Sequence, residues 1–428
     1  MRRGWLCALF FVSGASALVY ELVWQRMLIL IFGVSTLSVS AVLAAFMAGL
    51  ALGGMVFGRL ADRARRPLKL YAWLEAGIAV SGLLVPLAFR ATQTIYPSLY
   101  NALQAGPWSG TLLRFGLSML VLIVPATLIG GTLPVMGRLV MRRQETTSAA
   151  FSLLYAVNTL GAVAGAALTG FLALRYLGMQ HTLWLAAALN MAVALSARFM
   201  SRNETEALGG AVRSGRSATE SAPQSFMLVL AAVTGVTSMG FEVAWTRILG
   251  ILTSNSAYGF ALLLSVMLLG IGLGSLLQVW WSRRPGDNWS RLALCQWTLV
   301  AVTLVTLPFF RAAPAWFDRL CDGTSTVSIF AGELALTAWA LLAPAMLMGL
   351  SLPLLVAGTV REPGSYGNKL GRLYAVNTLG CVLGAFLTGF VLIPRLGIHA
   401  TVGVILGATL SVGVIAWERA AALTYRLR

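Results

Sequence analysis

The stretch YAVNTLG at residues 155–161 returns unchanged as YAVNTLG at residues 374–380, a separation of 219 residues. Gly165 and Gly384 follow the two copies at the same distance, so the match continues beyond the seven identical residues. A long match at a fixed offset is typical of an internal repeat. The chain is therefore predicted to contain two copies of one structural unit.

Three further pairs of segments match at nearly the same offset and extend the repeat across both halves of the chain. The pairs are 13–26 with 234–247, 49–53 with 270–274 and 125–134 with 344–353. The first pair keeps the spacing of Glu, Trp and Arg, the second that of two glycines, and the third that of Pro, Gly and Pro. We predict one repeat over residues 1–200, a second over 225–428, and a polar linker at 201–224.

Composition places both repeats in a membrane. Hydrophobic residues make up 58% of the 428 residues and charged residues 11%, whereas soluble domains are about 45–50% apolar and about 25% charged. Such a chain has more apolar surface than one soluble core could bury. The composition excludes a secreted, nucleic-acid-binding or cytosolic enzyme class, and it predicts the lipid bilayer as surroundings and no nucleic acid as partner.

The hydropathy pattern predicts about twelve membrane-spanning helices, six in each repeat. The expected spans are 5–30, 36–58, 69–89, 111–137, 148–174, 181–200, 225–250, 256–281, 289–310, 333–358, 367–393 and 398–417. Because six is an even number, both repeats enter the membrane in the same orientation. The predicted fold is an all-α membrane protein of two parallel six-helix repeats, similar to the major facilitator architecture.

The positions of the basic residues predict the orientation. Of 31 Lys and Arg residues, six fall in the loops of one side, two lie within spans, and the remaining 23 lie on the side of the termini. Cytoplasmic loops carry the excess of Lys and Arg, so both termini are expected in the cytoplasm of a bacterial inner membrane. The apolar run after Met1 has no small-residue cleavage site near Gly14, and we expect it to be a retained first helix.

Ionisable residues inside spans are costly and usually face a cavity or the bundle interior. Three pairs are related by the repeat: Glu21 with Glu242, Arg26 with Arg247, and Arg114 with Glu333. Together with two tryptophans they form the predicted central polar site: Glu21, Trp24, Arg26, Arg114, Glu242, Trp245, Arg247 and Glu333. This set is interpreted either as a site or gate for a polar or cationic group, or as a salt-bridge lock between the repeats.

Glu75 breaks the symmetry, because its counterpart in the second repeat is the neutral Gln296. A buried carboxylate can carry protons, which makes Glu75 a candidate for ion coupling. The alternative is a polar residue hydrogen-bonded to a neighbouring helix.

Tyr155 and Asn158 lie three residues apart on one helical face, as do Tyr374 and Asn377. Their polar groups could hold a ligand, but the nearby small residues favour hydrogen bonds between closely packed helices. The four cysteines are scattered without metal-ligand spacing, so we expect no metal and no cofactor.

The segment 58–66, GRLADRARR, resembles the major facilitator loop signature and contains Asp62. The sequence departs from that signature at Arg65, where glycine is usual, and residues 278–284 of the second repeat lack the aspartate. The resemblance implies a structural role for Asp62.

A more specific resemblance covers nearly the whole chain and points to the membrane domain of bacterial fused spermidine synthase-like proteins. It is carried by 13–14, by YELVWQR at 20–26, by FMAGLALG at 46–53, and by the two YAVNTLG segments. In that family an aminopropyltransferase-like domain with a Gly-rich nucleoside-binding loop usually accompanies the membrane part. No such loop occurs in residues 1–428, so we expect no enzyme activity from this chain alone.

The resemblance implies a protein that works with a separate spermidine synthase-like enzyme on its basic cytoplasmic face, or that handles a polyamine, a lipid or a membrane-embedded acceptor. The alternative is a self-sufficient secondary transporter of a cationic or amphipathic solute, with Glu21, Glu242 or Glu75 as the ion-coupling carboxylate.

Overall fold

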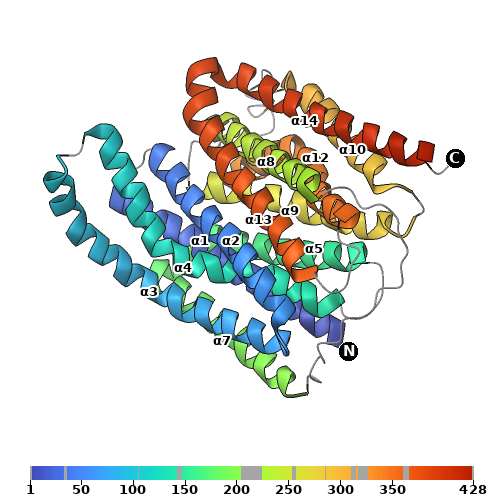
Figure 1. Cartoon of the computed structure of the whole chain (residues 1–428). Coiled ribbons are helices and arrows are strands. Elements are labelled where there is room, and N and C mark those ends of the chain that lie inside the picture. The colour runs from blue at the N-terminus through green and yellow to red at the C-terminus, as the bar shows by residue number, and fades with distance from the viewer. Residues whose placement is uncertain are drawn as a thin grey trace.

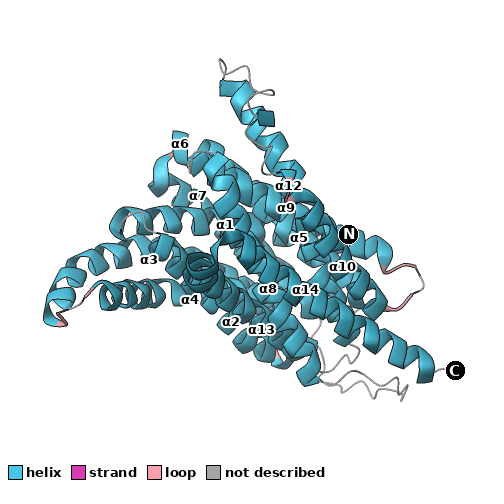
Figure 2. Ribbon diagram, turned by 90° about the horizontal axis from the view of Figure 1, so that it is seen from above, coloured by secondary structure: helices cyan, strands magenta, loops and turns pink. Residues whose placement is uncertain are grey.

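The protein folds into a bundle of long helices, seen in the computed structural model of the chain (Figure 1). The structure describes residues 2–32, 36–104, 106–141, 147–203, 224–252, 257–284, 286–309, 315–316, 326–359 and 366–426. Most of the predicted linker therefore lies outside the described residues. All regular structure in the described part is helical (Figure 2).

The first repeat forms α1 to α7 and the short η2. Its elements are α1 (Arg2–Phe32), α2 (Thr36–Arg63), α3 (Pro67–Ala102), α4 (Pro107–Met141), α5 (Thr147–Ala167), the π-helix η1 (Leu168–Ala173), α6 (Leu174–Tyr176), α7 (Gly178–Met200) and η2 (Ser201–Asn203). The second repeat forms α8 (Gln224–Leu252), α9 (Ala257–Trp281), α10 (Asn288–Thr306), α12 (Thr326–Thr359), α13 (Tyr366–Phe386), the π-helix η4 (Leu387–Leu392) and α14 (Ile393–Arg426).

Twelve crossings follow from these elements, as the hydropathy pattern predicts. Ten described helices or runs of helix are long and apolar enough to cross a membrane. The last run, Tyr366–Ala422, is two crossings, because Gly397 has a non-helical backbone inside it. The remaining crossing is α10, whose 19 residues begin with polar side chains. The chain is a multi-pass membrane protein of twelve helices in two parallel six-helix repeats.

The two repeats lie side by side, with α3 and α7 at one edge of the bundle and α10 and α14 at the other (Figure 1). Between the repeats, α2 packs on α13 and α5 packs on α9. Both termini lie at one end of the bundle, which we call the termini side, and the opposite end is called the far side.

Inside each repeat the YAVNTLG segment lies at a helix crossing where backbones touch. A Cβ at Gly161 or Gly165 of α5 would collide with carbonyl oxygens of α1, and a Cβ at Gly380 or Gly384 of α13 would collide with carbonyl oxygens of α8. Lipid tails are as apolar as leucine, so helices in a membrane associate through such small-residue contacts. The repeated sequence therefore specifies the α1–α5 and α8–α13 crossings.

The repeats share one apolar core at the termini side and have separate cores toward the far side. The shared core includes Phe10 and Tyr71 of the first repeat and Leu355 and Tyr366 of the second. Toward the far side, one core contains residues of the first repeat alone, among them Trp24. A third is built on the second repeat. The two halves are thus joined most extensively at the termini side.

Among the described residues, contact between the repeats at the far side includes η1 and α9. A Cβ at Gly170 of η1 would collide with the side chain of Ala261 on α9. Next to it, the rings of Phe171 and Phe330 meet edge to face with centroids 5.3 Å apart. The central region is therefore bounded by contacts between the halves at both ends.

The substitution Gly165→Ala tests the backbone contact of α1 with α5. The added methyl group would meet the carbonyl oxygen of Ala15, and forcing helices apart costs about 1–3 kcal/mol. We expect a lower midpoint of thermal unfolding in detergent, measured by size-exclusion chromatography after heating.

Gly407→Ala is the matched control, because nothing lies within 4 Å of a Cβ at Gly407 of α14. Alanine favours helix over glycine, so this variant should unfold at the wild-type temperature or above it. Equal midpoints for the two variants would contradict the packing role of Gly165.

Candidate functional site

Five polar side chains from both repeats are near enough to one another for their charges to interact, and we call them the central polar cluster: Glu21, Tyr155, Glu242, Tyr374 and Cys381. They come from α1, α5, α8 and α13. Glu21 and Glu242 are close enough for their charges to interact. The same holds for Tyr374 and Glu21. Cys381 is near Glu242, and Tyr155 is near Tyr374 and Cys381. The central polar cluster therefore spans the interface between the two repeats.

The two carboxylates lie at matching depths in matching helices. At 1.5 Å per residue, Glu21 lies about 28 Å from the start of α1, and Glu242 lies about 27 Å from the start of α8. Both positions are beyond the middle of their helices, toward the far side. The pair therefore occupies the part of the bundle where the two halves have separate cores.

Two carboxylates near each other in a membrane repel when both are charged. A proton on one of them, or a cation bound between them, removes that repulsion. Glu242 also borders a small cavity of about 10 Å³ between α8, α9 and α12, next to Trp245 and Thr246. This is about the space of one water molecule. The arrangement suits reversible binding of a positive charge.

The two tryptophans predicted for the site lie instead in the cores of their own repeats. Trp24 is 1% exposed and stacks on Tyr20 with ring centroids 5.0 Å apart. Trp245 is 2% exposed and belongs to the far-side core of the second repeat. Each tryptophan therefore supports the helix turn that carries Glu21 or Glu242.

The predicted basic residues also have different surroundings. Arg26 and Arg247 are exposed. The Nε atom of Arg114 donates a hydrogen bond of 3.0 Å to the hydroxyl of Tyr96 on α3, within the first repeat. Glu333 is half-buried on α12. Of the eight residues predicted for the central polar site, the structure brings Glu21 and Glu242 together at the interface between the repeats.

Glu75 lies inside the first repeat, between α1, α3 and α7, and is completely buried. Its carboxylate accepts hydrogen bonds from the hydroxyl of Ser13 and from the side-chain amide of Asn190. The counterpart Gln296 donates a bond of 2.9 Å to the hydroxyl of Ser351 in the second repeat. The geometry matches the hydrogen-bonding alternative for Glu75, and the candidate role in ion coupling stays a prediction.

The asparagines of the YAVNTLG segments bind backbone rather than line the central cluster. The side-chain amide of Asn158 donates to the carbonyl of Phe10 on α1, at 3.1 Å. In the same way Asn377 donates to the carbonyl of Ala231 on α8, at 2.9 Å. Each asparagine thus bridges the helices whose glycines allow the close contact.

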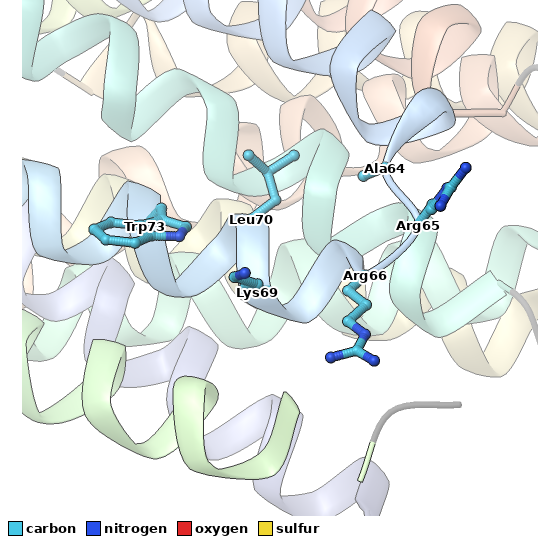
Figure 3. A pocket seen from close by; sticks show the side chains of 6 residues that line it. All are labelled: Ala64, Arg65, Arg66, Lys69, Leu70 and Trp73. Atoms are coloured by element: carbon cyan, nitrogen blue, oxygen red, sulfur yellow. The ribbon is translucent and has the colours of Figure 1, made fainter. Parts of the chain in front are cut away.

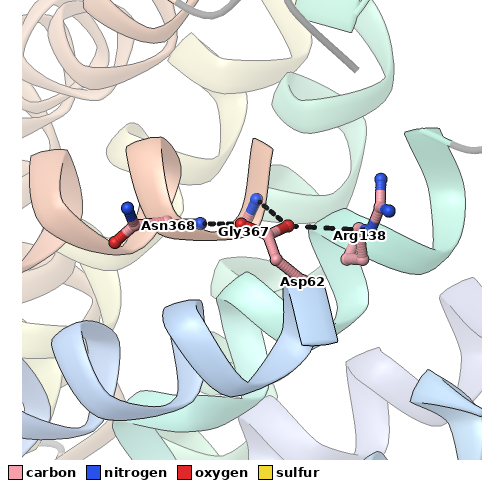
Figure 4. A network of polar contacts seen from close by, with 4 residues as sticks. All are labelled: Asp62, Arg138, Gly367 and Asn368. Carbon is pink, nitrogen blue, oxygen red and sulfur yellow. Dashed lines mark hydrogen bonds and ion pairs between the residues drawn. The ribbon is translucent and has the colours of Figure 1, made fainter. Parts of the chain in front are cut away.

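Asp62 joins the two halves at the termini side (Figure 4). Its carboxylate accepts hydrogen bonds from the backbone N–H groups of Gly367, at 2.9 Å, and Asn368, at 2.7 Å, in the first turn of α13. Arg138 of α4 lies 3.7 Å away and completes the network. A carboxylate at a helix N-terminus is stabilised by unsatisfied N–H groups and by the helix dipole.

Glycines let α2 approach α13 beside Asp62. A Cβ at Gly58 would lie 2.7 Å from the carbonyl oxygen of Gly367, and one at Gly371 would collide with that of Gly54. At the related α5–α9 contact, a Cβ at Gly272 would meet the flexible side chain of Leu160. At the termini side, the backbones of α2 and α13 therefore approach each other more closely than α5 and α9 do at this related contact.

Sequence analysis missed two partners in these sites. Cys381 directly follows the second YAVNTLG segment, but the first segment continues with Ala162, so the repeat gave no signal for a polar role. Arg138 is one of many basic residues near the termini side, and its spacing does not single it out as a partner of Asp62. Both become visible only when the helices are placed together.

The helices and their pairing define the class: a multi-pass membrane protein with the twelve-helix fold of major facilitator-type transporters. Among solved structures, the chain is similar to a bacterial homologue of the iron transporter ferroportin in an outward-facing state, with 16% identity, a TM-score of 0.63, and 97% and 98% of the two chains covered. The chain is also similar to the Escherichia coli fucose:proton symporter FucP (N162A), with 14% identity, a TM-score of 0.61, and 97% of each chain covered. At these identities the similarity shows the fold. No protein-family model matches the sequence, and no curated protein matches it.

The substitution Glu75→Ala tests the buried network of the first repeat. It would leave Ser13 and Asn190 without their described acceptor, and an unsatisfied buried donor costs about 1–3 kcal/mol. We expect a lower thermal unfolding midpoint in detergent, with a smaller loss for Glu75→Gln, which keeps an acceptor oxygen. Gln296→Ala, the counterpart in the second repeat, removes a neutral hydrogen bond and should cost less. Wild-type stability of Glu75→Ala would contradict this role.

The substitution Asp62→Ala tests the contact between the halves. Without the carboxylate, the first turn of α13 loses two charge-assisted bonds, so α2 and α13 should separate more easily. In a cysteine-free background, spin labels at positions 63 and 418, one exposed site per repeat, should show a longer and broader distance distribution.

Asp287→Ala is the control for this experiment. Asp287 caps its own helix α10 by accepting from the N–H of Ser290, entirely within the second repeat. This variant removes an N-cap aspartate on the same side and should leave the distance between the labels unchanged. A shift as large as that of Asp62→Ala would show that the effect is not specific to the α2–α13 contact.

Proposed function

We propose that this protein is a secondary transporter that moves a cationic or amphipathic solute through a site between its two repeats. The observation that carries the proposal is the pair of carboxylates Glu21 and Glu242, one from each repeat at matching depth, near enough for their charges to interact. Carboxylates inside spans are costly and mark ion or substrate pathways. Transporters built from such repeats bind substrates near the membrane midplane at the repeat interface.

The fold supports transport, and the central polar cluster favours a positive charge. The structural neighbours include a bacterial homologue of the iron transporter ferroportin, also solved with soaked iron, and a fucose:proton symporter. Two carboxylates without a described basic partner suit a cation better than a neutral sugar. Tyr374 is close enough to Glu21 for their charges to interact, and an aromatic side chain near a carboxylate is a favourable setting for an organic cation.

The proposed mechanism uses the repulsion between Glu21 and Glu242. With both carboxylates charged, the halves are pushed apart at the site; a bound cation draws the two side chains together and favours closure of α1 and α8 around it. A proton on either carboxylate competes with the cation for the same negative charge. Exchange of a di- or trivalent cation for one proton between the two open states would couple their movement and carry net charge across the membrane.

We also propose that the protein lies in a bacterial inner membrane with its termini side in the cytoplasm. This orientation rests on the excess of Lys and Arg on that side. The far side, where the central polar cluster is nearer the end of the bundle, would then face the periplasm.

Transport currents of proteoliposomes on a solid-supported membrane test this function. The probes are spermidine, tetraphenylphosphonium and Fe²⁺, with fucose as the neutral comparison. We expect a current with at least one cation, and a loss of about tenfold or more in Glu21→Gln and in Glu242→Gln, because each variant removes one of the two charges. Glu418→Gln, an exposed change on α14, should retain the wild-type current.

The absence of current with every cation, or wild-type currents in both central variants, would overturn the proposal. A current that responds to fucose and not to cations would reject the cation part and retain transport. The thermal midpoint of each variant is measured in parallel, so that loss of folding is not counted as loss of transport.

A second candidate function is the scaffold for a separate spermidine synthase-like enzyme. The specific observation in its favour is the exposed basic surface at the α2–α3 loop, where an acidic partner could dock. Most residues that carry the resemblance, including both YAVNTLG segments, pack helices together. The resemblance therefore indicates a shared fold more than a shared partner enzyme. A scaffold would give no current of its own and would co-purify with the enzyme.

A further inference from the structure

A basic cleft lies at the termini side, where α2 ends and α3 begins. It is lined by Ala64, Arg65, Arg66, Lys69, Leu70 and Trp73 and has a volume of about 450 Å³ (Figure 3). The cleft is shallow and open to its surroundings. Three cationic side chains and one tryptophan thus border a surface that an anionic group can approach.

The charges and the tryptophan are arranged along the helix axis. Lys69 and Trp73 are four residues apart on α3, so they share one face, and Figure 3 shows Lys69 between Trp73 and Arg66. Arg65, Arg66 and Lys69 are exposed, and Trp73 is 66% exposed. Tryptophan is enriched at membrane–water interfaces, where its ring lies at the level of the headgroups.

An apolar stripe continues from the cleft toward the middle of the membrane. Trp73, Val80, Leu84 and Leu87 follow one face of α3 at intervals of seven, four and three residues, and each is more than half exposed. The stripe spans about 21 Å, which exceeds half of the roughly 30 Å hydrocarbon core. Because α3 lies at the edge of the bundle, this face is turned to lipid (Figure 1).

We propose that the basic cleft is a binding site for an anionic phospholipid of the leaflet on the termini side. The phosphodiester binds beside Arg66 and Lys69, Arg65 adds positive charge from the loop, and the acyl chains lie along the stripe of α3. Both parts of the surface are needed for this ligand: the cations select a negative headgroup, and the stripe selects an amphiphile over a soluble anion. The cleft is distinct from the central polar cluster, and its occupancy does not depend on the transported solute.

Native mass spectrometry of the purified protein tests the proposal with phosphatidylglycerol and phosphatidylcholine as probes. The wild type should retain phosphatidylglycerol in preference to phosphatidylcholine. The triple variant Arg65→Gln, Arg66→Gln, Lys69→Gln should bind phosphatidylglycerol at least tenfold more weakly, because each cation near the surface contributes about fivefold. Inorganic phosphate in excess should not displace the lipid.

The control removes exposed charges from the same side of the membrane on the second repeat, away from α3: Arg283→Gln and Arg284→Gln. It should retain wild-type affinity for phosphatidylglycerol. Equal loss in the cleft variant and in the control would show a general surface-charge effect and would overturn the site, as would unchanged binding in the cleft variant. Displacement by inorganic phosphate would show a soluble-anion site instead of a lipid site.

Two further variants keep the test decisive if the triple variant does not fold. Lys69→Gln alone should weaken phosphatidylglycerol binding several-fold. Trp73→Ala, which changes no charge, should weaken the binding of both lipids by shortening the apolar stripe. Wild-type binding in both single variants would overturn the proposal.

Discussion

The close contact of helix backbones at the repeated glycines is the constraint on which the rest of the structure depends. In a membrane no hydrophobic force drives one apolar helix onto another, so association needs close packing and hydrogen bonds between helices. Gly161 and Gly165, with Asn158, supply both for α1 and α5. Their counterparts do the same for α8 and α13, and these two crossings place Glu21 and Glu242 at matching heights.

Much of the fold could be predicted because a membrane simplifies the physics. Each crossing needs about 20 apolar residues, so hydropathy shows the number of spans, and the exact repeat shows how the spans are grouped. The ends of the helices were harder to predict. Helix α3 runs to Ala102 through two prolines, well beyond the predicted span 69–89. The π-helices η1 and η4 were not predicted, since their composition is that of an ordinary apolar helix.

Less of the candidate site could be predicted from the sequence. A charged residue in a membrane span is unusual, but the sequence does not show how its helix is rotated and therefore which neighbour the side chain meets. Glu21 and Glu75 look alike in sequence, yet one faces the other repeat and the other is enclosed within its own. Trp24 keeps its spacing to Glu21 but turns into the core, because three residues on a helix change the direction by about 60°. Rotation is fixed by the packing of neighbouring helices.

The contact between the repeats is asymmetric at the termini side, while the central pair Glu21 and Glu242 is symmetric. Asp62 has Arg283 as its counterpart, and Gly58 has Val279, so the α2–α13 contact has features that α5–α9 lacks. Separating the halves there breaks charge-assisted bonds to α13 and a contact between backbones. At the far side, the described contact is apolar, between Phe171 and Phe330 and between Gly170 and Ala261. Opening the termini side therefore breaks charge-assisted bonds that the described far-side contacts do not include, although the carboxylates at the centre belong equally to both repeats.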